Sequence, residues 1–146
     1  MHWQRMFLHP MLKAFDAPTR EECTAQRPQS NTPLASLILL NDPTFVEAAR
    51  VFAEKIIKEG GEKFDSKVAY AFGKSVNRKP TLRELSVLSK LYAATVKDAR
   101  SNPKQMALLN KNGIAKIDSK VDDVELAGWN AVARVLLNMS ETNFRY

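Results

Sequence analysis

The chain has 146 residues, enough for one domain with a real core, since chains of about 150 residues bury roughly 70% of their unfolded surface. Its apolar share of 45% is ordinary for a globular protein, and no apolar stretch is long enough to span a bilayer. The net charge is +6, but the basic residues are scattered without a run of five. This pattern favours a solvated surface, and leaves nucleic acid or a polyanionic glycan as alternative partners.

The first 31 residues (1–31) are predicted to form an irregular segment packed on a helical domain. Their apolar start is interrupted at Pro10, which prevents one continuous helix. The stretch that follows is polar and contains further prolines. Within it, Thr19 and Glu22 have the spacing of a capping box, which predicts a helical turn over residues 21–25.

Four polar residues of this segment are the candidate binding residues: Asp16, Arg20, Arg27 and Asn31. A long connection is uncommon unless something holds it, and charge-assisted hydrogen bonds among these side chains or to backbone carbonyls supply one explanation. The alternative is that they line an enzymatic or carbohydrate-binding site shared with other domains. That hypothesis requires Asp16 and Arg20 to converge at the floor of an open cleft.

Two helix starts lie ten residues apart directly after this segment. Thr32 precedes Pro33, and Asp42 precedes Pro43, so each start offers a capping side-chain oxygen and then a proline at the first helical position. The first helix is apolar on nearly every side, which predicts that it is buried from water. Its apolar residues are Leu34, Leu37, Ile38, Leu39 and Leu40.

The helix after Pro43 is predicted to be amphipathic. Its apolar residues at helical spacing are Phe45, Val46, Ala49, Phe52, Ala53, Ile56 and Ile57, and its polar side carries Glu47, Arg50, Glu54, Lys55 and Lys58. Gly60 and Gly61 are predicted to end it.

A third helix is predicted to open at Asp65 or Ser66 and to end before Pro80. Gly73 lies inside it, at a cost of about 1 kcal/mol relative to alanine. We therefore expect Gly73 to mark the close approach of a neighbouring helix.

Three more helices follow. Thr81 and Glu84 have capping-box spacing and open a long helix. Pro103 begins a short helix that is predicted to end near Gly113. Asp122 or Asp123 opens the last one, which is apolar on most sides and should lie deep in the bundle. The sequence therefore predicts a single all-α domain over 1–146, a compact bundle of about five to six helices.

Residues that suggest chemistry all have a simpler interpretation. His2 and His9 with Asp16 are candidate metal ligands, but two histidines in a proline-broken segment are a weak constellation. Cys23, with a histidine and Asn31, is a candidate nucleophile by residue type alone. As the only cysteine, it also excludes an internal disulfide. No catalytic residue and no metal ligand is assigned.

An aromatic ligand cage is a further alternative. Its members are Trp129, Phe45, Phe52 and Phe72. Aromatic residues at helical spacing are typical of a core, so packing is the favoured interpretation.

Motifs along the chain resemble those of one known family. They are Phe15-Asp16-Ala17-Pro18, Arg20-Glu21, Cys23-Thr24, Asn31-Thr32-Pro33-Leu34, the run from Leu39 to Ala49, Arg78-Lys79-Pro80-Thr81 with Glu84-Leu85, and the run from Trp129 to Asn138. In these motifs the chain is similar to the C-terminal domain of unknown function of the large planctomycete cytochrome c multidomain proteins. Gln26 and Ala35 depart from that family's usual arginine and glutamine, so a polar site there would be incomplete here.

The resemblance implies that this chain is the C-terminal part of a longer protein, a fragment or a shortened paralogue. Haem is implied only for upstream domains, with no cofactor in this chain, and the parent family suggests a secreted or periplasmic location. The leading hypothesis is a non-catalytic packing or interaction module whose partners are those upstream domains, docked on an apolar patch around Trp3, Met6 and Phe7. The alternatives are the shared polar site and a basic polyanion-binding protein. The sequence names no reaction and no substrate.

Overall fold

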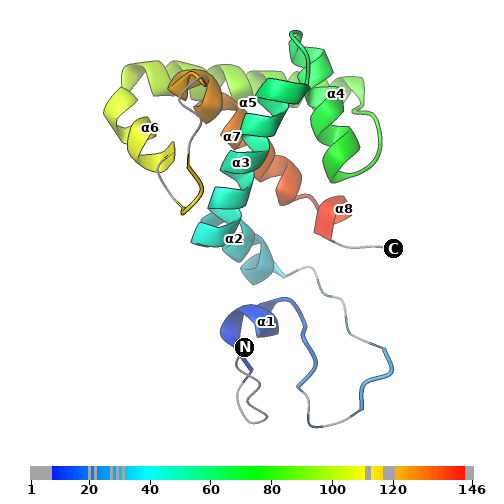
Figure 1. Ribbon diagram of the computed structural model, residues 1–146. Coiled ribbons are helices and arrows are strands. Elements are labelled where there is room, and N and C mark those ends of the chain that lie inside the picture. Colours follow the sequence, from blue (N-terminus) through cyan, green and yellow to red (C-terminus); the bar gives the residue numbers. More distant parts are fainter. Residues whose placement is uncertain are drawn as a thin grey trace.

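The computed structural model describes residues 8–19, 21, 23–26, 28, 30, 32–110, 113–116 and 121–143. Its helices are α1 (Pro10–Ala14), α2 (Pro33–Asn41), α3 (Pro43–Glu59), α4 (Phe64–Ser75), α5 (Leu82–Ser101), α6 (Pro103–Asn110), α7 (Asp123–Leu137) and α8 (Ser140–Asn143). The described residues contain no strand, and the predicted all-α bundle is confirmed (Figure 1). Among the described helices, none combines the length and apolarity that a bilayer crossing requires.

The two proline starts are formed as the sequence predicts. The Thr32 hydroxyl accepts a hydrogen bond from the Ala35 backbone N–H at 3.2 Å, and the Asp42 carboxylate accepts one from Thr44 N–H at 2.9 Å. Each bond satisfies an amide that the first helical turn leaves without a partner. The chain therefore turns sharply between α2 and α3, which share Asp42 as the end of one helix and the cap of the next.

The starts of α5 and α7 follow the same chemistry, and the start of α4 does not. Thr81 and Glu84 form the complete capping box at the start of α5, and Asp122 caps α7 through a 3.0 Å bond from Glu125 N–H. The start of α4 was predicted at Asp65 or Ser66, but α4 begins earlier, after Lys63, with no side-chain cap. Asp65 instead lies in the first turn, where the helix dipole still favours its charge.

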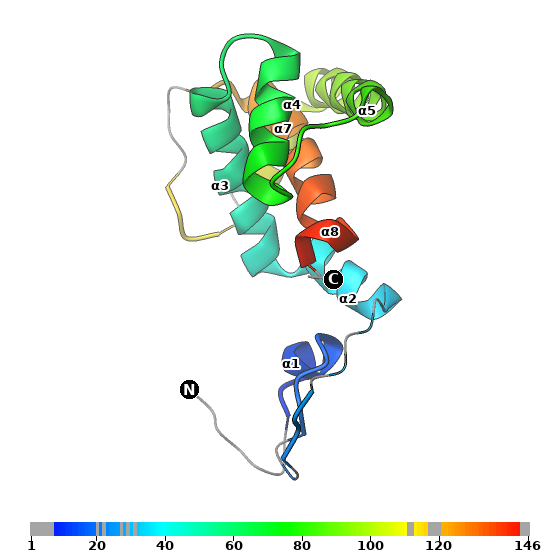
Figure 2. The ribbon, with the colours of Figure 1, turned by 90° about the vertical axis from the view of Figure 1, so that its right-hand side faces the viewer.

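The core is built around α7, which lies between α3 and α5, with α4 and α6 beside it (Figures 1 and 2). Its buried residues include Leu126, Trp129, Val132, Ala133 and Leu136, so the prediction of a deep last helix is confirmed. The main core also takes Ala53 and Ile56 from α3, Val68 and Phe72 from α4, and Leu88 from α5.

Trp129 is a core residue, as the packing interpretation predicted, but its aromatic neighbours are different ones. Its ring stacks on Phe64 with 5.3 Å between centroids and lies 5.1 Å from the ring of Tyr92. Phe45, which the cage hypothesis grouped with Trp129, instead pairs with Phe15 at 6.0 Å. Burial raises the pKa of the Tyr92 hydroxyl, as expected for a phenol held against this cluster.

The prediction that α2 is hidden from water is wrong. α2 is a helix, but Leu34 and Leu37 each keep 56% of their surface exposed, Ile38 and Leu40 are only half-buried, and Ala35 is its one fully buried residue. The helix lies at the end of the bundle, where α1, α3 and α7 pack against it. An all-round apolar sequence makes burial favourable, but these neighbours cover only part of a helix surface.

Arg134 joins this end helix to the centre of the bundle. Its guanidinium, on α7, donates a hydrogen bond to the carbonyl oxygen of Leu40 at 2.5 Å. The last carbonyls of a helix have no partner within the helix, so this bond satisfies one of them. α2 is therefore held at its C-terminal end while its outer leucines face water.

The prediction for Gly60 and Gly61 is confirmed, and the prediction for Gly73 is wrong. Gly60 and Gly61 end α3 as predicted, and Gly61 has a φ of +84° that other residues rarely adopt. A Cβ at Gly73 would meet no atom within 4 Å, so the predicted close helix approach there is wrong. The close approach occurs at Gly128 on α7, where a Cβ would lie 2.6 Å from the ring of Tyr92.

The N-terminal segment extends beyond the α2 end of the bundle (Figures 1 and 2). It holds the short helix α1, which starts at Pro10, with the imidazole of His9 accepting from Met11 N–H at 3.3 Å. Residues 23 and 24, in the middle of the predicted helical turn, have no regular structure, so that turn is not formed there. The boundaries of the single domain, and the packing of 1–31 upon it, stay predictions.

Candidate functional site

Asp16 is the one candidate binding residue that the structure describes. Its carboxylate accepts hydrogen bonds from the Ser30 backbone N–H at 2.7 Å and from the Ser30 hydroxyl at 2.6 Å. These bonds close the loop between α1 and α2, which is the pinning role considered for this residue. Arg20, Arg27 and Asn31 lie outside the described residues, so their convergence with Asp16 on a shared site stays a prediction.

Of the candidates for metal and thiol chemistry, the structure describes His9, Asp16 and Cys23. His9 caps α1, His2 lies outside the described residues, and Cys23 is an exposed free thiol. Among the described residues, no group of three or more histidine, cysteine, aspartate or glutamate side chains is placed to hold a metal ion. The apolar patch expected at Trp3, Met6 and Phe7 also falls outside the described part of the chain.

A buried ion pair on α3 is a feature that the sequence did not predict. Arg50 and Glu54 were assigned to the polar side of the helix, but only 1% and 8% of their surfaces are exposed. The guanidinium donates to the Glu54 carboxylate at 2.7 Å and, across the bundle, to the carbonyl oxygen of Ala115 at 2.7 Å. Their helical spacing showed that the two side chains meet, but only the fold shows that a loop covers them.

Glu47, one turn earlier on α3, binds the backbone of the same loop. Its carboxylate accepts hydrogen bonds from the backbone N–H groups of Ile114 at 2.7 Å and Ala115 at 2.5 Å. Gly113 makes this possible, because its φ is +107° and a Cβ there would overlap the Glu47 side chain. Glu47 and Arg50 therefore hold residues 114 and 115 against α3, and Glu54 pairs with the Arg50 guanidinium.

A second charged cluster fastens the C-terminal helix. Arg78 binds Glu84 with two hydrogen bonds of 2.9 and 2.6 Å, and Glu141 of α8 with two of 2.8 and 3.1 Å. The guanidinium also lies over the ring of Phe72, with 5.2 Å to its centroid. This paired geometry lowers the pKa of Glu84 to about 2 and also lowers the pKa of Glu141.

This cluster predicts a pH dependence of stability. The pKa of Glu84 falls from 4.5 to about 2 on folding, so its stabilisation is complete above pH 4.5 and is lost as the pH falls towards 2. Because both side chains are partly exposed, we expect on the order of 1 kcal/mol. The check is the free energy of unfolding of the wild type and of Glu84→Gln from pH 7 to 2, since glutamine keeps the capping box. The difference between them should shrink below pH 4.5, and a constant difference would contradict the assignment.

The described bundle has two surface grooves. One, of about 430 Å³, is lined by Thr44, Glu47, Ala48, Val51, Phe52 and Lys55. The other, of about 280 Å³, lies between α4, α5 and α7, and its lining includes Phe72, Glu84, Val87, Leu88, Val135 and Met139. In each groove the carboxylate is already engaged, Glu47 by loop amides and Glu84 by Arg78. Neither arrangement offers an acid or base held ready for proton transfer.

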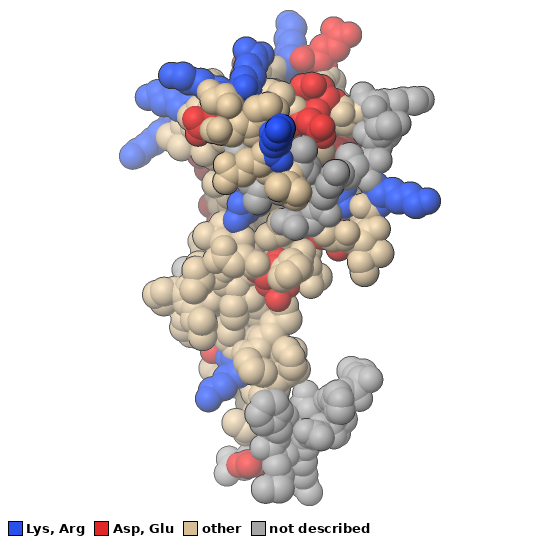
Figure 3. Space-filling view, turned by 90° about the vertical axis from the view of Figure 1, so that its left-hand side faces the viewer, with Lys and Arg blue, Asp and Glu red and all other residues tan. Residues whose placement is uncertain are grey.

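Several exposed apolar side chains lie at the α2 end of the molecule. Leu12 of α1 is 41% exposed, and Leu34 and Leu37 of α2 are each 56% exposed. We call these three residues the apolar end. Figure 3 shows that this part of the molecule carries few lysine, arginine, aspartate or glutamate side chains, whereas the upper bundle carries many. A concentration of exposed large apolar side chains is typical of a surface that binds another protein surface.

The second distinct surface is a row of basic residues on α5. Arg83, Lys90 and Lys97 are all exposed and recur every seven residues. The basic residues look scattered in the sequence because they form no run of adjacent charges. The signal that was available is the spacing of seven, which brings side chains onto one side of a helix.

These features define a class: an all-α module whose polar clusters serve its own fold and whose accessible features are an apolar end and a basic helix face. Comparison with known proteins gives a family. A family model described as PSD1, protein of unknown function (DUF1553), matches residues 1–92. No curated protein and no solved structure matches the chain.

The chain belongs to this PSD1 family of unknown function. The match covers the motifs from Phe15 to Leu85 on which the family resemblance rests. It does not extend to the run from Trp129 to Asn138 in α7. The family membership is therefore carried by the N-terminal segment and the first four helices, together with the first half of α5.

Proposed function

We propose that this chain is a non-catalytic helical interaction module, the C-terminal part of a planctomycete cytochrome c type multidomain protein. Its apolar end is the surface on which the upstream part of that protein packs. The observation that carries the proposal is the exposure of Leu34 and Leu37, at 56% each, on the most apolar helix of the chain.

The energetics support docking at this end. Burying apolar surface is favourable by about 25 cal/mol per Å², so leucines left more than half exposed represent unused binding energy. α2 is also anchored from behind by Arg134, which fixes the helix while its outer face stays accessible. A rigid, apolar helix face is well suited to packing against another folded domain.

The charged clusters support a role without catalysis. The side chains of Glu47 and Arg50 bind a loop of the same chain, and Glu54 binds the Arg50 guanidinium. Arg78 binds two glutamates. Each of these groups has a structural partner that accounts for its presence. The proposal therefore assigns haem and any chemistry to the parent protein's other domains, in a secreted or periplasmic setting.

The test of the apolar end is the double variant Leu34→Ser/Leu37→Ser. The wild-type chain alone should bind an apolar fluorescent dye and self-associate in light scattering, and this variant should lose most of both signals. Because both leucines are largely exposed, its stability should change by only about 1 kcal/mol. The matched control is Leu82→Ser/Ile114→Ser, two leucine-sized residues that are exposed elsewhere and should leave both signals unchanged.

Three outcomes would count against the proposal. A monodisperse, dye-silent wild-type monomer would remove the apolar end as a binding surface. Equal loss in the control variant would show that the signal is not specific to α2. A discrete dimer that the Leu34→Ser/Leu37→Ser variant abolishes would make a second copy the partner in place of the upstream domains.

The upstream gene sequence tests whether the proposed parent protein exists. A reading frame continuous with this chain that encodes a haem domain and further domains supports the proposal, and a stop codon before Met1 contradicts it.

A further inference from the structure

The basic row on α5 consists of Arg83, Lys90 and Lys97. A helix advances 1.5 Å and turns about 100° per residue, so positions seven apart are about 10.5 Å apart along the axis and about 20° apart around it. The three cations therefore occupy an arc of about 40° along most of the helix. Lys104, on the first turn of α6, continues the spacing and is also exposed.

These cations differ from the other basic residues near the core. Lys67 of α4 pairs with Glu125 at 2.7 Å, and Lys74 lies over the ring of Tyr70. Within the described part of the chain, Arg83, Lys90 and Lys97 have no such partner. Unpaired cations in a line create a continuous positive potential along the helix.

The carboxylates of α5 do little to cancel this potential. Glu84 is held by Arg78 and by the Thr81 amide, so its charge is already compensated. Asp98 is the other one, and it follows Lys97 by about 100° around the helix, off the line of the row. Figure 3 shows lysine and arginine side chains projecting from the upper part of the bundle.

We propose that the outer face of α5 binds a linear anionic polysaccharide. Successive acidic groups along one extended polymer chain pair with the side chains of Arg83, Lys90 and Lys97. The small exposed residues between them, Ser86, Ala93 and Ala94, let the polymer lie close to the helix. This surface is separate from the apolar end, and the proposal does not depend on docking there.

Two features favour a polysaccharide over nucleic acid. The exposed positions of α5 carry no aromatic residue, so bases of a single strand have no side chain to stack on. The helix also contains no asparagine or glutamine for reading base edges. A helix lying in a duplex groove meets phosphates on both of its sides, whereas these cations form one row.

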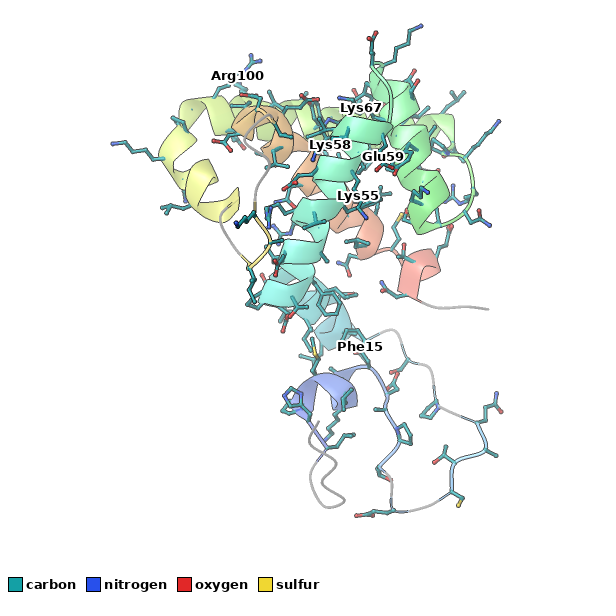
Figure 4. All side chains as sticks on the ribbon, viewed as in Figure 1. Phe15, Lys55, Lys58, Glu59, Lys67 and Arg100 are labelled. Carbon is teal, nitrogen blue, oxygen red and sulfur yellow. The ribbon has the colours of Figure 1, made fainter. Side chains whose placement is uncertain are left out.

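The test compares two triple variants of the full chain. Arg83→Gln/Lys90→Gln/Lys97→Gln removes the row, and Lys13→Gln/Lys55→Gln/Lys63→Gln removes the same charge from exposed positions outside α5. Figure 4 shows Arg100 projecting from the α5 side of the molecule and Lys55 on α3, and Figure 2 places α3 and α5 on opposite sides of the bundle. Binding of fluorescent heparin and of a 20-base-pair DNA duplex is measured at 50 and 200 mM salt, with circular dichroism to confirm folding.

We expect wild-type and control chains to bind heparin, with a dissociation constant at least tenfold lower than that of the row variant at 50 mM salt. Three contacts to a polymer as densely charged as DNA predict that wild-type binding weakens by about 40-fold from 50 to 200 mM salt. Equal losses in the two variants would show that net charge alone acts, and would overturn the proposal. If the wild type binds DNA more tightly than heparin, and the row variant loses that binding, the ligand is nucleic acid in place of a polysaccharide. If the wild type does not bind heparin, the proposal is rejected.

Discussion

Replacing Arg50 by methionine is expected to lower the free energy of unfolding by about 3–5 kcal/mol. Methionine fills the volume of the arginine stem but leaves the Glu54 carboxylate buried without its 2.7 Å partner. The change also removes the hydrogen bond that holds Ala115 to the bundle. Urea unfolding at pH 7, followed by circular dichroism, measures the loss.

The double variant Arg50→Met/Glu54→Leu separates the charge effect from the packing effect. With both charges gone, no group is left buried and ionised, so most of the stability should return. Glu54→Leu alone completes the double-mutant cycle. A single Arg50→Met variant that loses less than about 1 kcal/mol would show that the pair is hydrated in solution, which would contradict its burial.

Two glycine-to-alanine substitutions are expected to change stability in opposite directions. Gly128→Ala places a methyl group against the Tyr92 ring and Val96, and Tyr92 has no room to move because it packs on Trp129 and Phe64. Overpacking of this kind costs about 1–3 kcal/mol. Gly73→Ala meets no atom within 4 Å and should instead gain up to about 1 kcal/mol from helix propensity.

Thermal unfolding of the two variants beside the wild type gives the comparison. The contrast is informative because both glycines lie inside helices and differ in what faces them. A gain of stability in Gly128→Ala would mean that the packing of α5 on α7 differs from the one described. A loss in Gly73→Ala would mean that the surface of α4 at Gly73 is not open.

Local chemistry explains why most helix boundaries were predictable. Thr32, Asp42, Thr81 and Asp122 each carry a side-chain oxygen that satisfies an amide within three residues of it, so sequence proximity alone identifies the bond. The α4 start was missed because Lys63 offers no such oxygen. Where the cap is a short-range hydrogen bond, a reader of the sequence has all the necessary information.

Burial was less predictable, because it depends on residues far apart in the chain. The sequence of α2 shows that it is apolar, but not that the end of the bundle leaves Leu34 and Leu37 exposed. The helical spacing of Arg50 and Glu54 shows that they meet, but not that a loop 65 residues later covers them. Gly73 and Gly128 are likewise indistinguishable until their neighbours are known.

One of the two candidate functional surfaces was predictable from the sequence, and the other was not. The basic row on α5 was within reach of sequence reasoning, since a spacing of seven on a securely predicted helix is a local pattern. The apolar end was expected elsewhere, around Trp3, Met6 and Phe7, because those residues are the most apolar part of the N-terminus. Which apolar residues remain exposed after folding is a property of the whole bundle.

Native-state hydrogen exchange of α2, compared with α7, tests most directly the claim that α2 is an exposed docking helix. Amides that open only through global unfolding exchange slowest, while those of a helix with one exposed side open at a lower free energy. The account predicts that, in this chain alone, the amides of Leu37 to Asn41 exchange at least tenfold faster than those of Leu126 to Val132. In the longer parent protein that we propose, they should become protected to the level of α7. Protection of α2 equal to that of α7 in the chain alone would show that α2 is already buried, and would contradict the account.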